Sequence, residues 1–102
     1  MTVEVLYVDD CPSHARLMPA LRALADGHDA QVTQRRVNTP ERADEARFLG
    51  SPSVHVNGRD IEPGADDRSD YGMKCRLYRS LGGQSGVPPR EWIERALNEA
   101  AG

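Results

Sequence analysis

The chain has 102 residues, of which 38% are hydrophobic, 28% charged and 5% aromatic, a size that fits one compact domain and excludes a repeat array or a multidomain enzyme. Thirteen basic and sixteen acidic residues give a formal net charge of -3, and no basic cluster stands apart from Asp or Glu, which argues against nucleic acid as a partner. No apolar run approaches the roughly 20 residues of a membrane span, and Met1–Asp10 lacks the basic start of a signal peptide. We therefore expect a single domain over residues 1–102, in a soluble cytoplasmic protein that binds neither nucleic acid nor membrane.

The first strand and the first helix are predicted on either side of Cys11. Val3–Val8 is rich in β-branched and apolar residues and predicts a short, buried strand. After Cys11, apolar residues three and four positions apart predict an amphipathic helix: Leu17, Leu21, Leu24 and Ala25. Gly27 is expected to cap the end of this helix. Pro19 predicts a kink within it, and a break at Pro19 is the alternative.

A second strand, a second helix and a hairpin follow. Gln31–Val37 alternates weakly and predicts a strand, and a helix is expected over Pro40–Leu49 because Pro suits the first helical position. Ser53–Val56 predicts a third strand. It is followed by Asn57-Gly58, the sequence typical of a type I′ hairpin turn, and by a fourth strand over Arg59–Ile61.

The last third of the chain is expected to hold a polar loop and two helices. Glu62–Met73 is rich in Asp, Gly and Pro and predicts a solvated loop. A helix is predicted over Cys75–Leu81, a flexible break over Gly82–Gly86 and a final helix from Pro88. The final helix carries an apolar stripe of Trp92, Ile93, Ala96 and Leu97. This order of elements predicts an α/β fold, with a mixed central sheet of about four strands flanked by helices.

Three short features resemble the thioredoxin superfamily. Cys11–His14 follows the first strand, Pro19 lies eight residues after the cysteine, and Ser51–Val54 opens the third strand. The corresponding features of the superfamily are an active-site Cys-x-x-Cys or Cys-x-x-Ser at a helix start, a helix-kinking proline and a cis-proline loop beside the cysteine. The resemblance implies a thioredoxin-like fold, with Pro52 after a cis peptide bond.

Longer segments extend the resemblance over nearly the whole chain, from Val3 to Ala100. They are Leu6–Pro12, Phe48–Val54, Tyr71-Gly72 with Cys75–Tyr78, and Gly86–Pro89 before Trp92-Ile93. In these segments the chain is similar to a family of small bacterial thioredoxin-like proteins, some with selenocysteine, known as the DF family and often labelled alkylmercury lyase. Its members largely lack an assigned substrate, so the resemblance implies the fold more strongly than the activity.

Cys11 is the best candidate for a nucleophile. A cysteine at a helix N-terminus meets unpaired backbone N–H groups and the positive end of the helix dipole, and both favour the thiolate. His14 lies about one helical turn further on and would stabilise the thiolate or shuttle a proton, unless it is simply a solvent-facing residue. Asp9 and Asp10 would oppose the thiolate if they point at it. The alternative for Cys11 is an inert residue at a strand-to-helix turn.

Cys75 is the only other cysteine. His14 stands where the second cysteine of a Cys-x-x-Cys would be, so the chain works as a monothiol or recruits Cys75. The fold resemblance implies that Cys75 lies close to the start of the active-site helix, where it would resolve a disulfide on Cys11. Simple packing of Cys75 in the core is the alternative. His28 and His55 lack metal-ligand spacing and are expected to be structural.

Three functions are compatible with these residues. The first is a thiol redox protein in which Cys11 attacks a disulfide, a peroxide or a glutathione mixed disulfide, while Pro52 places a backbone edge that binds a partner peptide by strand addition. The second is a mercury or soft-metal protein, resembling alkylmercury lyase, that uses Cys11, Cys75 and Asp9 or Asp10. The third is a non-catalytic binding module. We rank them in this order. A protein disulfide or a small thiol such as glutathione is the expected partner, and no cofactor is expected. The sequence does not indicate an oligomeric state.

Overall fold

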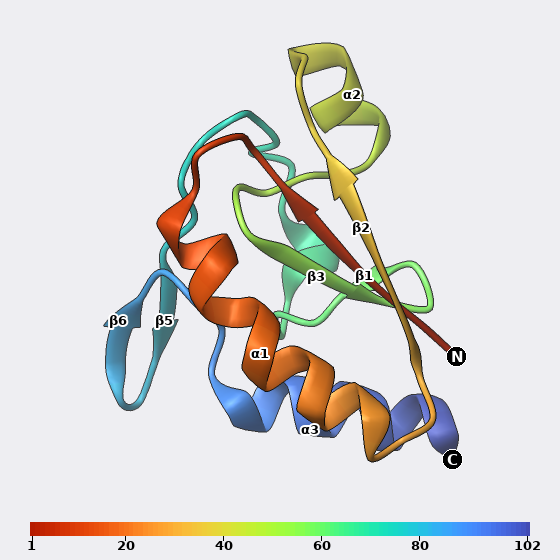
Figure 1. Cartoon of the computed structure of the whole chain (residues 1–102). Coiled ribbons are helices and arrows are strands. Elements are labelled where there is room, and N and C mark those ends of the chain that lie inside the picture. The colour runs from red at the N-terminus through yellow and green to blue at the C-terminus, as the bar shows by residue number, and fades with distance from the viewer.

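Four strands form one mixed sheet at the centre of the chain, as the computed structural model, which describes residues 1–102, shows (Figure 1). Their spatial order is β2 (Gln31–Arg36), β1 (Thr2–Tyr7), β3 (Ser53–Val56) and β4 (Arg59–Asp60). β1 runs parallel to β2 and antiparallel to β3, and β4 is antiparallel to β3. The predicted α/β fold with a mixed sheet of four strands is confirmed.

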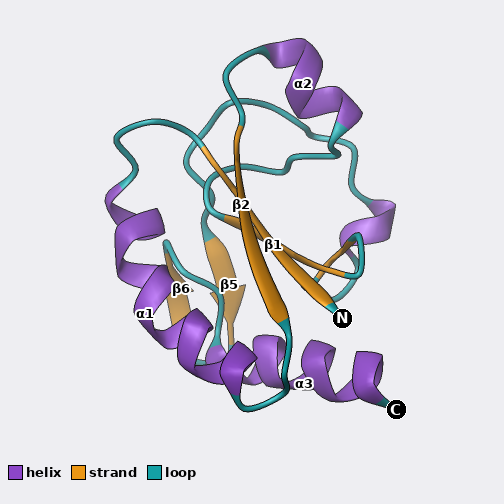
Figure 2. Cartoon of the chain, turned by 45° about the vertical axis from the view of Figure 1, so that its right-hand side comes forward, coloured by secondary structure: helices purple, strands orange, loops and turns teal.

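Two helices cover one face of this sheet. α1 (Pro12–Asp26) and α3 (Arg90–Ala101) run beside each other on the same side (Figure 2). The main core between them and the sheet is almost entirely aliphatic: Val3, Val5, Val54, Val56 and Ile61 from the sheet and its hairpin, Leu17 and Leu21 from α1, and Ile93 and Leu97 from α3. Burial of each such side chain contributes roughly 1.5–3 kcal/mol relative to exposure, so this layer is the main source of stability.

The opposite face carries a smaller core below α2 (Pro40–Glu45). Leu6, the β1 residue that points away from the main core, packs with Val37, Ala43 and Phe48. α2 ends four residues earlier than predicted, because Arg47 adopts a left-handed conformation with φ of 52°. This turn takes the chain out of the helix and directs Phe48 into the core.

The predictions for the first helix and the hairpin are largely confirmed. α1 continues through Pro19, so the alternative of a break there is wrong. Gly27 is the C-terminal cap but keeps a right-handed conformation, and the left-handed residue is Asp29. Asn57 and Gly58 have φ of 50° and 85°, the two positive values that a type I′ turn needs.

The predicted helix over Cys75–Leu81 is wrong. The chain is extended there and forms a separate hairpin of β5 (Tyr78–Ser80) and β6 (Gly83–Ser85), which also replaces the predicted flexible break. Arg76 and Tyr78 are buried while Leu77 between them is half-exposed, and this alternation is that of a strand. Leu81 lies fully exposed in the hairpin turn whereas Tyr78 is buried, so the spacing of Cys75, Tyr78 and Leu81 that predicted a helix does not reflect one buried face.

The remaining segment, predicted as a polar loop, is irregular except for the 3-10 turn η1 (Ala65–Asp67). Its first half joins β4 to η1 and its second half leads to Cys75. None of the helices combines the length and the hydrophobicity that a membrane crossing needs.

Candidate functional site

Cys11 lies where the sequence predicts it, at the start of α1. It is the N-cap residue, with φ of -94° and ψ of 106°, and its carbonyl accepts hydrogen bonds from the N–H groups of His14 (3.1 Å) and Ala15 (3.4 Å). Pro12 takes the first helical position, where a missing N–H costs nothing. The Cys11 side chain makes no capping hydrogen bond, and its thiol is free and partly exposed. This thiol is therefore available to a reagent from solution.

The two acidic residues before Cys11 differ in their surroundings. The Asp9 carboxylate lies 3.6 Å from the guanidinium of Arg36 at the end of β2. Asp10 is exposed and adopts a left-handed conformation, which turns the chain from β1 into α1. The negative charge of Asp9 is thus partly offset by Arg36.

His14 points back toward the sheet. Its ring stacks on Tyr7, with the ring centres 3.9 Å apart and the planes within 5° of parallel, and its Nε2 lies 2.7 Å from Oε1 of Gln34 on β2. These contacts make His14 a link between the first turn of α1 and strands β1 and β2. Neither of them involves Cys11.

The turn before β3 contains the predicted cis proline. The peptide bond between Ser51 and Pro52 is cis. Ser51 is buried, and its hydroxyl accepts a hydrogen bond of 3.1 Å from the N–H of Val8, close to Cys11 in the chain. This bond attaches the turn to the segment that leads into the helix start.

The backbone of Ser51 is already paired with another segment of the same chain. Its N–H donates to the carbonyl of Lys74 (2.7 Å), and its carbonyl accepts from the N–H of Arg76 (2.9 Å), which forms a parallel bridge opposite Cys75. The expectation that Pro52 places a free backbone edge there for strand addition is therefore wrong, because both polar groups of Ser51 are occupied.

Cys75 is thus brought to the same turn, on an exposed stretch of chain. Ser51 contacts both cysteine-bearing segments, one through its side chain and the other through its backbone. Cys75 also lines a cavity of about 670 Å³, to which Cys11 does not contribute. The other lining residues are Leu49, Glu62, Pro63, Arg68, Lys74, Arg76, Leu77, Arg79 and Trp92. The two thiols are free and make no disulfide.

A buried arginine, which the sequence analysis missed, fixes this stretch. The side chain of Arg76 is 1% exposed and donates hydrogen bonds to Asp60 (2.6 and 2.9 Å), to the hydroxyl of Ser53 (2.9 Å) and to Glu62 (3.3 Å). Burial by itself would lower the pKa of Arg76, but the hydrogen bond to Asp60 and the surrounding negative charges outweigh it and raise that pKa. Arg76 therefore stays charged in the interior, with its carboxylate partners around it.

Tyr78 completes the attachment. Its hydroxyl donates a hydrogen bond of 2.6 Å to the carbonyl of Pro52, and burial raises the pKa of Tyr78 well above its ordinary value, so the hydroxyl keeps its proton. The segment Lys74–Tyr78, called the strap below, is thus bound to the Ser51–Pro52 turn through backbone and side chains. Gly50 shows how closely they pack, because a Cβ on Gly50 would lie 3.0 Å from the Cβ of Arg76.

The chain after β6 also reaches the helix start. Gly86 packs against the side chain of Ser13, and no room remains for a Cβ at Gly86 unless Ser13 moves. Two segments far along the chain therefore lie close to the start of α1: the Ser51 turn, which is bonded to Val8 before the helix, and the loop at Gly86, which contacts Ser13 in its first turn. The resemblance to the thioredoxin superfamily implied that the Ser51–Pro52 turn lies beside the cysteine, whereas the contact of Gly86 with Ser13 was not predicted, since the sequence pattern gives no signal for it.

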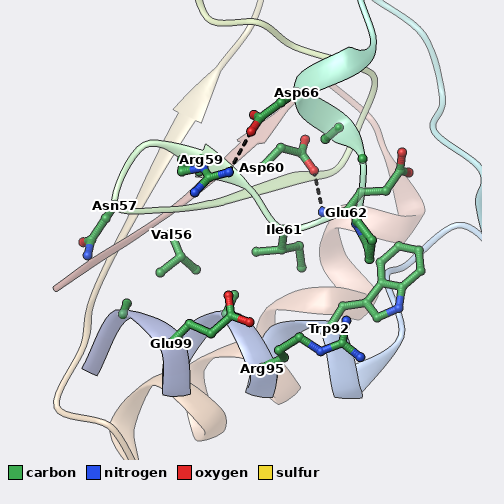
Figure 3. Close-up of a pocket in the computed structure, with 15 residues that line it drawn as sticks. Val56, Asn57, Arg59, Asp60, Ile61, Glu62, Asp66, Trp92, Arg95 and Glu99 are labelled. Atoms are coloured by element: carbon green, nitrogen blue, oxygen red, sulfur yellow. Dashed lines mark hydrogen bonds and ion pairs between the residues drawn. The ribbon is translucent and has the colours of Figure 1, made fainter. Parts of the chain in front are cut away.

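A second cavity is lined by neither cysteine. It measures about 450 Å³ and lies between α3 and the β4–η1 segment, with Trp92, Arg95 and Glu99 on its helical side (Figure 3). An ion pair of 2.7 Å between Arg59 and Asp66 lies on the other side. Its walls carry both signs of charge and no cysteine, so it offers no thiol chemistry.

The two remaining histidines have structural surroundings, as predicted. His28 is hydrogen-bonded to the carbonyl of Leu24 (3.1 Å) and to Asn98 of α3 (3.0 Å), so it joins the ends of two helices. His55 is buried in β3, 3.7 Å from Asp60. No three His, Cys, Asp or Glu side chains are grouped as metal ligands.

Comparison with known proteins found no relative of the chain. No protein family, no curated protein and no solved structure matches the chain. The functional interpretation therefore rests on the free thiol at the start of α1 and on the segments that surround it.

Proposed function

We propose that the protein is a thiol redox protein that acts through Cys11, on the thioredoxin-like fold that the sequence resemblance implies. The observation that carries the proposal is the position of Cys11: a free, partly exposed thiol at the N-cap of the 15-residue helix α1. The sheet order β2-β1-β3-β4 and the Ser51–Pro52 turn beside the cysteine segment support the thioredoxin-like assignment.

The start of α1 favours the reactive form of the thiol. The first N–H groups of a helix lack intrahelical acceptors, and the helix dipole places partial positive charge there, so a thiolate is stabilised relative to a thiol. Of the two carboxylates that precede Cys11, Asp10 is exposed to solvent and Asp9 is paired with Arg36. The arrangement therefore supports a nucleophile at Cys11.

The reaction is a thiol–disulfide exchange. The Cys11 thiolate attacks one sulfur of a disulfide, a new S–S bond forms to Cys11, and the other sulfur leaves as a thiolate. A second thiol then attacks this mixed disulfide and releases the bound half as a thiol. Cys75 is the internal candidate for that second thiol, since its segment is bridged to Ser51, and a small thiol such as glutathione is the external one.

Mass spectrometry of the intact protein tests this proposal. The wild type, Cys75→Ser and Cys11→Ser are equilibrated in graded glutathione redox buffers, and the thiols are then trapped by alkylation. We expect the wild type to lose two protons reversibly as the Cys11–Cys75 disulfide forms, and Cys75→Ser to carry a glutathione adduct on Cys11 instead. The Cys11→Ser variant is the matched control for reaction at Cys75 alone.

Two thiols that stay free across the whole series would contradict the proposal. That result would favour the two other functions expected from the sequence, a mercury or soft-metal thiolate protein or a non-catalytic module. The affinity for mercuric ion separates these two: a soft-metal protein holds one ion between both thiolates, so the wild type should bind it more tightly than either single variant, whereas in a non-catalytic module the two free thiols bind it independently.

A further inference from the structure

The strap occupies the position at which an incoming strand would pair beside Cys11. Strand addition requires a free N–H and a free C=O on the accepting edge. At Ser51 the N–H donates to the carbonyl of Lys74, and the C=O accepts from the N–H of Arg76. The outer edges of the sheet belong to β2 and β4, whereas Ser51 is the residue that contacts the Cys11 segment through Val8.

Displacement of the strap would also cost a large amount of free energy. To free Ser51, the chain must break two backbone hydrogen bonds and withdraw Arg76 from Asp60 and Glu62. Separation of a buried ion pair leaves uncompensated charges in the interior, which is strongly destabilising. The hydrogen bond from Tyr78 to the carbonyl of Pro52 would be lost as well.

We infer that the exchange partners of Cys11 are low-molecular-weight disulfides, and that extended polypeptides gain no backbone recognition at this site because the strap permanently occupies the Ser51 edge. This inference rests on the proposed function and names its substrate class. A small disulfide needs access only to the exposed part of the Cys11 thiol. The exchange transfers one half of the small disulfide to Cys11 and releases the other half as a thiolate.

Two probes with the same leaving group test the inference. Both are mixed disulfides with 5-thio-2-nitrobenzoate: one of N-acetylcysteine amide, the other of a short unstructured peptide with a central cysteine. The protein carries Cys75→Ser, so that only Cys11 reacts, and release of the coloured thiolate gives each rate constant. We expect the peptide to react no faster than the small probe.

The outcomes separate the inference from the proposed function. A peptide advantage of about tenfold, equivalent to about 1.4 kcal/mol of added binding, overturns the inference while Cys11 chemistry stands. If neither probe reacts faster with this protein than with a Cys11→Ser control that retains Cys75, the proposed function fails and the inference with it.

Hydrogen exchange and one conservative variant test the strap itself. The amides of Ser51 and Arg76 should exchange as slowly as those of the central strands, and exchange at the rate of exposed loops would overturn the inference. Tyr78→Phe keeps the ring but removes the hydrogen bond to Pro52, so it should raise the rate of the peptide relative to the small probe. Tyr71→Phe, outside the strap, is the matched control and should leave this ratio unchanged.

Discussion

The guanidinium carbon of Arg76 lies 4.4 Å from the centre of the Tyr78 ring. One buried cation is therefore in contact both with the phenol that holds Pro52 and with the carboxylate of Asp60 on β4. Since the strap contributes Arg76 and Tyr78 together, the two side chains stabilise the same segment, and their effects on its stability are expected to be coupled rather than additive.

Arg76→Met should be severely destabilising. It leaves the carboxylates of Asp60 and Glu62 without their buried partner, which costs about 3–5 kcal/mol in the free energy of unfolding. Urea unfolding measures this cost. Arg68→Met, at an ion pair with a side chain 33% exposed, is the matched control and should cost about 1 kcal/mol or less. Equal losses in the two variants would show that burial of Arg76 has no special role.

Ser51→Ala should destabilise through a single unpaired donor. The N–H of Val8, which is partly buried, loses its acceptor, and the cost should lie toward the lower end of the roughly 1–3 kcal/mol of a fully buried unsatisfied group. The free energy of unfolding in urea, compared with the exposed control Ser80→Ala, gives the difference. A loss at Ser51 no greater than at Ser80 would mean that another acceptor replaces the hydroxyl.

Acid should destabilise the protein through His55. Burial, the largest effect, lowers the pKa of His55 below its ordinary value of 6.5, although the charges of Asp60 and Glu4 partly oppose it. Below pH 6.5, His55 therefore binds a proton in the unfolded chain more readily than in the folded state. The free energy of unfolding should fall as the pH decreases through this range. Above it, His55 is neutral in both states and has no effect on the pH dependence.

Urea unfolding over a pH series through this window checks the sign. His55→Gln should reduce the loss of stability in acid. His28→Gln is the control, because hydrogen bonds to Asn98 and Leu24 raise the pKa of His28, so its contribution is present at low pH and is lost as pH rises. An unchanged acid slope in His55→Gln would show that other groups cause it.

Cys11 should react with iodoacetamide faster than free cysteine at the same pH, because its free, partly exposed thiol lies at the start of α1. Cys75→Ser and Cys11→Ser form a matched pair with one thiol each. The rate of alkylation is followed against pH for both. A profile for Cys11 that coincides with that of free cysteine would remove the main support for catalysis.

His14→Phe should leave the alkylation rate of Cys11 and its pH profile unchanged. Phenylalanine can keep the stacking on Tyr7 and loses only the contact with Gln34. The same iodoacetamide assay in the Cys75→Ser background measures the effect. A shifted profile would instead support the role in thiolate stabilisation that the sequence suggested for His14.

The parts of the fold that local signals specify were predictable from the sequence. The β-branched run of β1 and the Asn57-Gly58 turn each act over a few residues, and both elements form as expected. The strap was mispredicted because Cys75, Tyr78 and Leu81 have helical spacing, whereas the residues that are buried are Tyr78 and the charged Arg76. No rule of hydrophobic pattern places an arginine in the interior.

The candidate site was also predictable only where local sequence signals specify it. The position of Cys11 follows from a strand end and a helix start that are adjacent in the chain. The bridge from Ser51 to the strap joins residues far apart in the sequence. Its buried Arg76 is paired with Asp60, which was predicted only as part of the fourth strand, and with Glu62, which was predicted in a solvated loop. Their role becomes visible only when the hairpin and the strap lie against each other.

The central place of β1 has a consequence for synthesis on the ribosome. Val3 pairs with Val32 of β2 on one side and with Val56 of β3 on the other. β1 is synthesised before β2 and β3, so it can pair on both sides only after both strands have left the ribosome. Even then the nascent chain holds Asp60 without its counter-charge until Arg76 has left the exit tunnel. The growing polypeptide therefore exposes one unpaired edge of the apolar strand β1 until Ser53–Val56 has emerged, the kind of surface that chaperones shield.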